Sequence, residues 1–246
     1  MLAGILHQAG YFLGDRLHEP RASNPRGFFE WYKINRINEE ILSPYGKENL
    51  ILRLKKRWLN KVNTTHHPGK DQRWLLALPL GVDVVSADPD VEKEIVRVVR
   101  REPFCYKDPR FSYTLAVWRR HLPAGTVSIC VFREPDVTVE SIIKECRDRE
   151  YLADLSIDRR SAYRVWVDIY SHILFKHATP DEDFMFVHYN QIFEGTAIPL
   201  LSQALGVQLE GNFIDRALKR TAPAGGVPGR VREIYGMLCR RAGYSD

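Results

Sequence analysis

Hydrophobic positions follow two patterns that alternate along the chain. Apolar residues at helical spacing predict helices at 2–13, about 32–43, 91–101, 112–121, 136–147, 157–177, 191–205, 211–220 and 228–242. Short continuous apolar runs predict strands at 104–107, 126–132 and 184–189. Continuous apolar strands separated by helices are typical of a parallel sheet that is covered on both faces. We therefore predict a single α/β domain over residues 1–246, with a central parallel β-sheet flanked by helices on both faces.

One stretch departs from this rhythm. Residues 60–73 are polar and rich in turn-forming residues, which predicts a surface loop.

Composition excludes several classes of protein. The chain has 246 residues, of which 44% are hydrophobic and 27% charged, as in an ordinary globular protein. No apolar run approaches the roughly 18–20 residues of a membrane span, and no secretory signal is visible. The four cysteines are far apart and form no Cys-x-x-Cys pair. We expect a cytoplasmic protein without a membrane span, disulfides or zinc.

The charge balance is mildly basic, with 36 Lys and Arg against 31 Asp and Glu, a net charge of +5. Such an excess suits an anionic ligand, but it suits solubility equally well. The densest basic cluster, residues 53–61, contains only one aromatic residue, Trp58. We therefore expect a solvated helix face there and no nucleic-acid partner.

Candidate chemistry follows each of the predicted strands. Ligands of open α/β sheets bind outside the carboxyl ends of the strands. The residues at these ends are Lys107-Asp108-Pro109-Arg110, Arg133-Glu134-Pro135-Asp136 and His188-Tyr189-Asn190. Cations and carboxylates together at a sheet edge either pair with one another or meet a ligand. Structural Asp108–Arg110 and Arg133–Glu134 pairs explain these residues as well as a binding site does.

The second of these segments has a more specific pattern. Pro135 suits the first turn of a helix that starts beside Arg133, and Ser141 follows about two turns later. A guanidinium, a hydroxyl and a helix N-terminus can converge on one phosphate. The pattern predicts an anion site.

In order and spacing, these segments resemble those of bacterial sulfotransferases that use 3′-phosphoadenosine 5′-phosphosulfate (PAPS). The resemblance implies a P-loop-type α/β fold, with Arg133 and Ser141, eight residues apart, holding the 3′-phosphate of the donor. It places Tyr189 near the adenine, although Asn190 and Gln191 replace the two acids of the family's segment. Lys219 and Arg220 would reach the 3′-phosphate as the family's C-terminal basic loop does, although the Arg-Lys-Gly pattern of that loop is not preserved.

The resemblance extends to the N-terminal part of the chain. Residues 10–30 are similar to the segment that follows the family's phosphosulfate-binding loop, so the first strand and that loop would stand before Met1. We expect either an internal methionine or truncated start, or a natural relative that has lost the loop and only binds.

For an active enzyme, the resemblance implies sulfuryl transfer to a hydroxyl or amine, without a metal. Glu30 or Asp108 would be the general base, and Lys107 or Arg110 would stabilise charge on the bridging oxygen. A carboxylate favoured by a helix dipole explains Glu30 equally well. The family suggests a saccharide or natural product as the acceptor. The oligomeric state stays open.

Two other classes of function stay in view. One is a non-catalytic sulfotransferase-like protein that binds a nucleotide or serves a structural role. The other is a nucleotide kinase, against which the absence of a Walker-type lysine loop argues.

Overall fold

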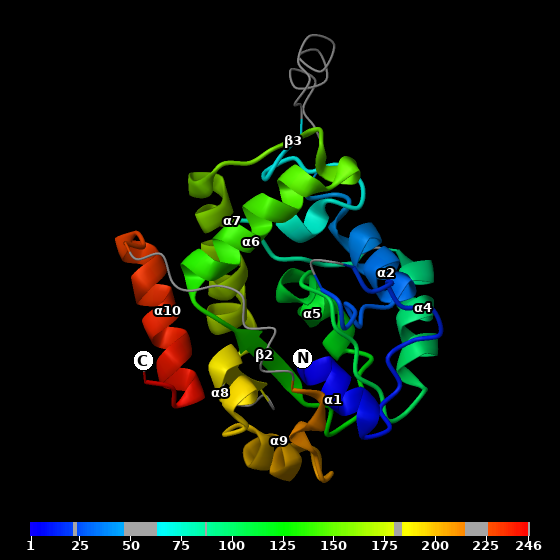
Figure 1. The fold of residues 1–246 in the computed structure, drawn as a ribbon. Coiled ribbons are helices and arrows are strands. Elements are labelled where there is room, and N and C mark those ends of the chain that lie inside the picture. The colour runs from blue at the N-terminus through cyan, green and yellow to red at the C-terminus, as the bar shows by residue number, and fades with distance from the viewer. Residues whose placement is uncertain (22–23, 47–62, 87, 180–183, 215–225, 246) are drawn as a thin grey trace.

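The computed structural model of the chain describes residues 1–21, 24–46, 63–86, 88–179, 184–214 and 226–245. The described residues form a mixed α/β structure in which two short parallel sheets are flanked by helices (Figure 1). Six of the helices are, in chain order, α2 (Tyr32–Leu42), η1 (Arg73–Leu75), α4 (Pro89–Val99), α5 (Phe111–Arg119), η2 (Glu150–Leu152) and η4 (Gly211–Phe213).

The main sheet pairs β2 (Ser128–Phe132) with β4 (Phe184–His188) in parallel. Its register runs from Ser128 opposite Phe184 to Phe132 opposite His188. The two strands therefore end level with each other, and the residues that follow them start from the same edge. A second, two-residue pairing joins β1 (Asn63–Thr64) to β3 (Leu155–Ser156).

Helices cover both faces of the main sheet. Cys130, Phe132 and Phe186 pack on one face against α6 (Pro135–Asp148), α7 (Arg159–His172) and α10 (Gly229–Ala242). Ile129, Met185 and Val187 pack on the other face against α1 (Leu2–Gln8), α8 (Tyr189–Glu194) and α9 (Ile198–Leu205). Alternate residues of each strand face opposite sides, as the pleat requires. The α/β class and the helical layers on both faces are confirmed.

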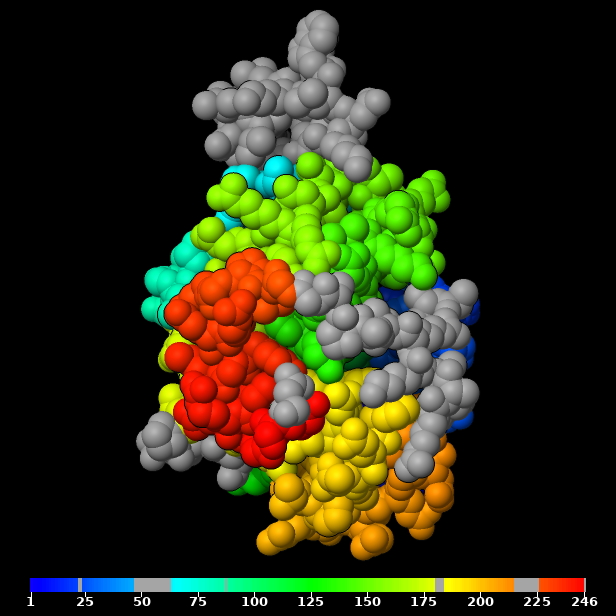
Figure 2. All heavy atoms as spheres, turned by 60° about the vertical axis from the view of Figure 1, so that its left-hand side comes forward, coloured from blue at the N-terminus to red at the C-terminus, as the bar shows by residue number. Residues whose placement is uncertain are grey.

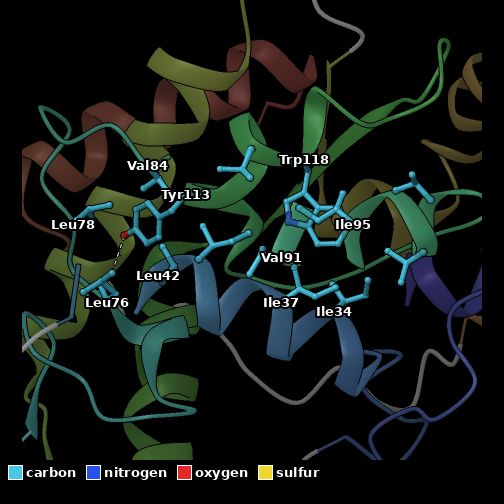
Figure 3. Packing of buried hydrophobic residues seen from close by; sticks show 14 residues of the cluster. Ile34, Ile37, Leu42, Leu76, Leu78, Val84, Val91, Ile95, Tyr113 and Trp118 are labelled. Carbon is cyan, nitrogen blue, oxygen red and sulfur yellow. Dashed lines mark hydrogen bonds between the residues drawn. The ribbon is translucent and has the colours of Figure 1, made fainter. Parts of the chain in front are cut away.

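A separate hydrophobic cluster holds α2, α4 and α5 together (Figure 3). Trp118 and Tyr113 are buried in it, and each polar atom has a partner. Trp118 Nε1 donates to Asn38 Oδ1 over 2.8 Å, and Tyr113 Oη donates to the carbonyl oxygen of Leu76 over 2.8 Å. The large rings therefore contribute their apolar area without leaving a donor unpaired.

Five predicted helices lie close to observed ones, at 32–43, 91–101, 112–121, 136–147 and 228–242. The helix predicted at 157–177 is α7, which continues as a π-helical turn over Ile173–His177.

Two helix predictions differ from the structure, and a third falls largely outside the described residues. Helix α1 stops at Gln8 because Gly10 takes φ +90°, after which Phe12 forms a parallel bridge with Phe104. The helix predicted at 191–205 is broken by Gly195 at φ +86° into α8 and α9. Of the helix predicted at 211–220, the structure describes only the 3₁₀ turn Gly211–Phe213 and Ile214, and the other residues lie outside the described part.

The strand predicted at 104–107 forms no ladder with the main sheet. Within the described residues its one strand pairing is the bridge between Phe104 and Phe12. Two of the three predicted strands, 126–132 and 184–189, therefore pair in the main sheet, and the third does not.

The polar stretch 60–73 is more closely packed than a surface loop, as far as residues 63–73 describe it. Asn63, Thr65 and Gln72 are buried. Asn63 Nδ2 donates to Asp154 Oδ2 over 2.7 Å, and Gln72 Nε2 donates to Asp154 Oδ1 over 2.6 Å. Polar composition here reflects buried hydrogen bonding, which a hydropathy pattern does not distinguish from exposure.

The C-terminal helix lies over the end of β4. Figure 2 shows α10 (red) against α8 (yellow) on one face of the molecule. Gln191 Nε2 donates to the carbonyl oxygen of Ala242 over 3.0 Å, which joins the two helices. No helix in the described ranges is long and apolar enough to cross a membrane.

The π-helical turn contains His177, a buried histidine whose surroundings disfavour its protonated form. His177 Nε2 lies 2.9 Å from the carbonyl oxygen of Ser112, and its Nδ1 has no partner among the described residues. Burial, together with the nearby Arg119, lowers the pKa of His177 from 6.5 to about 4. In the unfolded chain this imidazole binds a proton at higher pH than in the folded one.

We therefore expect His177 to make the folded state less stable as the pH falls from 6.5 towards 4. Over this window the unfolding free energy of the wild type should fall relative to that of His177→Gln by up to about 3 kcal/mol. Urea unfolding of both proteins across the window measures this difference. A constant difference between pH 7 and pH 4 would contradict it.

Candidate functional site

The carboxyl edge of the main sheet brings two of the sequence-predicted residues together. Arg133 and Tyr189 directly follow Phe132 and His188, which are partners in the parallel register. Neighbouring strands lie about 4.8 Å apart, so these two residues start from adjacent positions.

Arg133 is a partly buried cation without a carboxylate partner. Its Nε donates to Thr138 Oγ1 over 3.4 Å, and within the described ranges no carboxylate forms an ion pair with it. Burial lowers the pKa of Arg133, while nearby Tyr170, Tyr189 and Glu134 favour its charge. Glu134, considered above as its structural partner, instead accepts a hydrogen bond from Asn190 Nδ2 over 3.1 Å. The Arg133 guanidinium is therefore available to an anionic ligand.

Helix α6 extends this site along one of its faces. Thr138 and Ser141 are three residues apart, so their side chains lie on the same side of the helix, one turn from each other. Ser141 is exposed. The helix begins at Pro135, and its N-cap residue Glu134 makes no side-chain capping bond. The Arg133 guanidinium and the Thr138 and Ser141 hydroxyls thus lie near the first turns of α6. Such an arrangement is suited to binding a phosphate.

Aromatic rings adjoin the Arg133 site. Tyr189 stacks on Phe193 with ring centroids 6.1 Å apart, and Tyr170 packs against Trp166 at 4.6 Å. Burial raises the pKa of Tyr170, so its phenol stays neutral beside the guanidinium. A flat base could stack beside Arg133 on such rings.

The sequence pointed to His188 and Asn190 at this strand end, but not to the network that they form with the C-terminal segment. His188 is fully buried, its Nδ1 accepts from the backbone N–H of Asn190 over 3.1 Å, and its ring stacks on Tyr244 with centroids 3.8 Å apart. Asn190 Nδ2 also donates to Tyr244 Oη over 2.9 Å. The available signal in the sequence was His188, a polar residue at the end of an otherwise apolar strand. The network ties the C-terminal segment to the end of β4.

A second group of charged residues forms around Glu30. Lys107 Nζ lies 2.6 Å from Glu30 Oε1 and 3.1 Å from the carbonyl oxygen of Phe28, to which it donates. Glu30 stands two residues before α2, makes no capping bond to that helix, and is mostly buried. Its carboxylate therefore has an ion-pair partner in Lys107.

Backbone strain adjoins this carboxylate. Phe29 has φ +55°, a left-handed conformation that a bulky side chain rarely adopts. Its ring packs edge-on against Phe213 with centroids 5.5 Å apart. Strained residues of this kind cost on the order of 1–3 kcal/mol and cluster at functional sites.

Asp108 is occupied by structural hydrogen bonds. Its Oδ1 accepts from the backbone N–H of Arg110 over 2.9 Å and from Arg110 Nη1 over 3.0 Å. Its Oδ2 accepts from Asn35 Nδ2 over 2.7 Å and from Asn38 Nδ2 over 3.0 Å. The side chain is 0% exposed. A carboxylate with four donors and no access is poorly placed to take a proton from a substrate, so the structure argues against Asp108 as the base.

Arg110 extends this buried group to a second carboxylate. Its Nε lies 2.7 Å from Glu39 Oε1, and Arg73 Nη1 lies 2.6 Å from Glu39 Oε2. Although burial opposes the charge, Asp108 and Glu39 raise the pKa of Arg110. The structural Asp108–Arg110 pair is therefore present.

The two parts of the site share the packing of α1. Cys105, two residues before Lys107, lies in the same hydrophobic cluster as Ile129 of β2 and the first turn of α1. Lys219 and Arg220 lie outside the described residues. In the described part of the chain, no group of three or more residues could hold a metal ion.

Comparisons with protein-family models, with curated proteins and with solved structures found no match.

The contrast between the two carboxylates has a measurable consequence for stability. Asp108→Asn removes the charge that pairs with Arg110 and turns an amide nitrogen towards donors, so we expect a loss of about 3–5 kcal/mol. Glu30→Gln breaks an ion pair whose lysine is about half-exposed, and we expect a loss below about 1 kcal/mol. Urea unfolding of the two isosteric variants makes the comparison. Equal losses would show that Asp108 has no special structural role.

Proposed function

We propose that this chain is a PAPS-dependent sulfotransferase of the P-loop-type α/β fold. It would transfer the sulfuryl group of the donor to a hydroxyl or amine of a saccharide or natural-product acceptor. The observation that carries the proposal is Arg133, a desolvated guanidinium at the carboxyl edge of the sheet with no carboxylate paired to it in the described part of the chain.

The donor's terminal phosphate fits this position. A buried cation is costly unless an anion compensates it, and a phosphate offers a guanidinium a bidentate acceptor. Ser141, on the same side of α6 as Thr138, supplies a hydroxyl for a further oxygen. Tyr189, which begins at the adjacent strand end, supplies a ring for the adenine. We assign the 3′-phosphate of the donor to Arg133 and Ser141.

The Glu30–Lys107 pair fits the transfer step. Glu30 would accept the acceptor proton as the acceptor oxygen attacks sulfur, and the bond between sulfur and the bridging oxygen of the 5′-phosphate would break. Lys107 would stabilise the negative charge that develops on that oxygen. The products are the sulfated acceptor and 3′,5′-adenosine bisphosphate (PAP). As in phosphoryl transfer, positioning and electrostatics supply most of the catalysis.

The assignment of Arg133 is tested with two nucleotides that differ by one phosphate. We expect calorimetry to show that the wild type binds PAP more tightly than 5′-AMP. Arg133→Ala should weaken PAP binding on the order of 10- to 100-fold, because it removes hydrogen bonds to a charged group. It should leave AMP binding unchanged, since AMP lacks the 3′-phosphate.

Arg147→Ala is the matched control, because Arg147 lies on the same helix and, in the part of the chain that the structure describes, pairs with exposed Asp148. This variant should bind both nucleotides as the wild type does. If Arg133→Ala still preferred PAP over AMP by the wild-type factor, Arg133 would not hold the 3′-phosphate. If the wild type bound neither nucleotide, the proposed function itself would fail.

A further inference from the structure

Two short segments run antiparallel beside the Glu30–Lys107 pair. The backbone N–H of His18 donates to the carbonyl oxygen of Glu30 over 2.9 Å, and Leu17 lies opposite Trp31. Side chains alternate between the two faces of such a ribbon. Leu17 and Trp31 share one face, and Trp31 packs against the core. On the opposite face lie Arg16, His18, Glu30 and Tyr32.

Ring contacts on this face fix the position of His18. Its imidazole lies 3.7 Å from the ring of Tyr32, centroid to centroid, with the planes tilted by 30°. The guanidinium of Arg16 lies 5.2 Å from the centroid of the same tyrosine. Held in this way, His18 Nε2 is 2.7 Å from Asn35 Oδ1.

Electrostatics determine how the Asn35 amide is oriented. Its Nδ2 lies 2.7 Å from Asp108 Oδ2 and 3.4 Å from Glu30 Oε2. The reversed amide would turn its oxygen towards both carboxylates, which are acceptors only. Asn35 Oδ1 therefore faces His18, and His18 must carry a hydrogen on Nε2.

We propose that Asn35, held by His18, is the positioning residue that aims the Glu30 carboxylate. This inference rests on the proposed function, because it takes Glu30 as the general base. Lys107 holds Oε1 of that carboxylate, and Asn35 faces Oε2. When Lys107 turns to the bridging oxygen of the donor, Asn35 stays as the donor that keeps Glu30 directed at the acceptor. The 3.4 Å contact shortens at that point, as catalytic hydrogen bonds commonly do on substrate binding.

Measurements of kcat distinguish a role of Asn35 in positioning Glu30 from a role in folding. With the saccharide acceptor that supports the fastest conversion of PAPS to PAP, Asn35→Ala should lower kcat about 100-fold, because a misplaced base loses its alignment. The KM for PAPS and the affinity for PAP should stay unchanged. His18→Leu should lower kcat about 10-fold, whereas His18→Gln, whose amide can donate to Asn35, should restore most of it. His66→Leu, at an exposed histidine, is the matched control and should have no effect.

An activity-independent measurement tests the same geometry. Nitrogen NMR of the ¹⁵N-histidine-labelled full chain should show neutral His18 protonated on Nε2, and Asn35→Ala should shift the Nε2 resonance because it removes the acceptor of that hydrogen bond. His18 protonated on Nδ1 would overturn the proposal, as would equal kcat values for His18→Leu and the wild type. If the wild type failed to bind PAP, the proposed function would fail, and the NMR result alone would decide how Asn35 is oriented.

Discussion

The buried ion-pair network of Asp108, Arg110 and Glu39 is the interaction on which the candidate catalytic site depends. It joins α2 to the segment that carries Lys107, through distances of 3.0 Å from Arg110 to Asp108 and 2.7 Å to Glu39. Buried charges are stable only when their hydrogen bonds are complete, and Asp108 has all four. The network thereby fixes Lys107, the residue immediately before Asp108, against Glu30. Asp108 is a structural anchor, which leaves Glu30 as the proposed general base.

The proposed donor side of the site depends on a different constraint, the register of β2 and β4. Because both strands end at the same level, Arg133 and Tyr189 leave the sheet together. The hydrogen bond between Asn190 and Glu134 then withdraws the nearest carboxylate from Arg133. Arg133 stays available to an anionic ligand because Glu134 accepts its hydrogen bond from Asn190.

The sequence predicts the donor side better than the catalytic side. Apolar strands followed by helices suffice to place Arg133 and Tyr189 at one edge, since parallel strands share an end. The Glu30–Lys107 contact joins residues 77 positions apart through a segment that forms no ladder, so no periodicity reveals it. Asn35 and His18 were missed because hydropathy patterns do not show which polar side chains are buried. Gly10 and Gly195 adopt positive φ angles and interrupt the predicted helices there. Nothing in the sequence around Phe29 indicates its left-handed backbone conformation.

A crystal structure of the full chain with PAP tests the central claim most directly. The account predicts the 3′-phosphate within hydrogen-bonding distance of the Arg133 guanidinium and the Ser141 hydroxyl, the adenine beside Tyr189, and the 5′-phosphate directed towards Lys107 and Glu30. PAP bound elsewhere on the molecule, with Arg133 left free of it, would contradict the account.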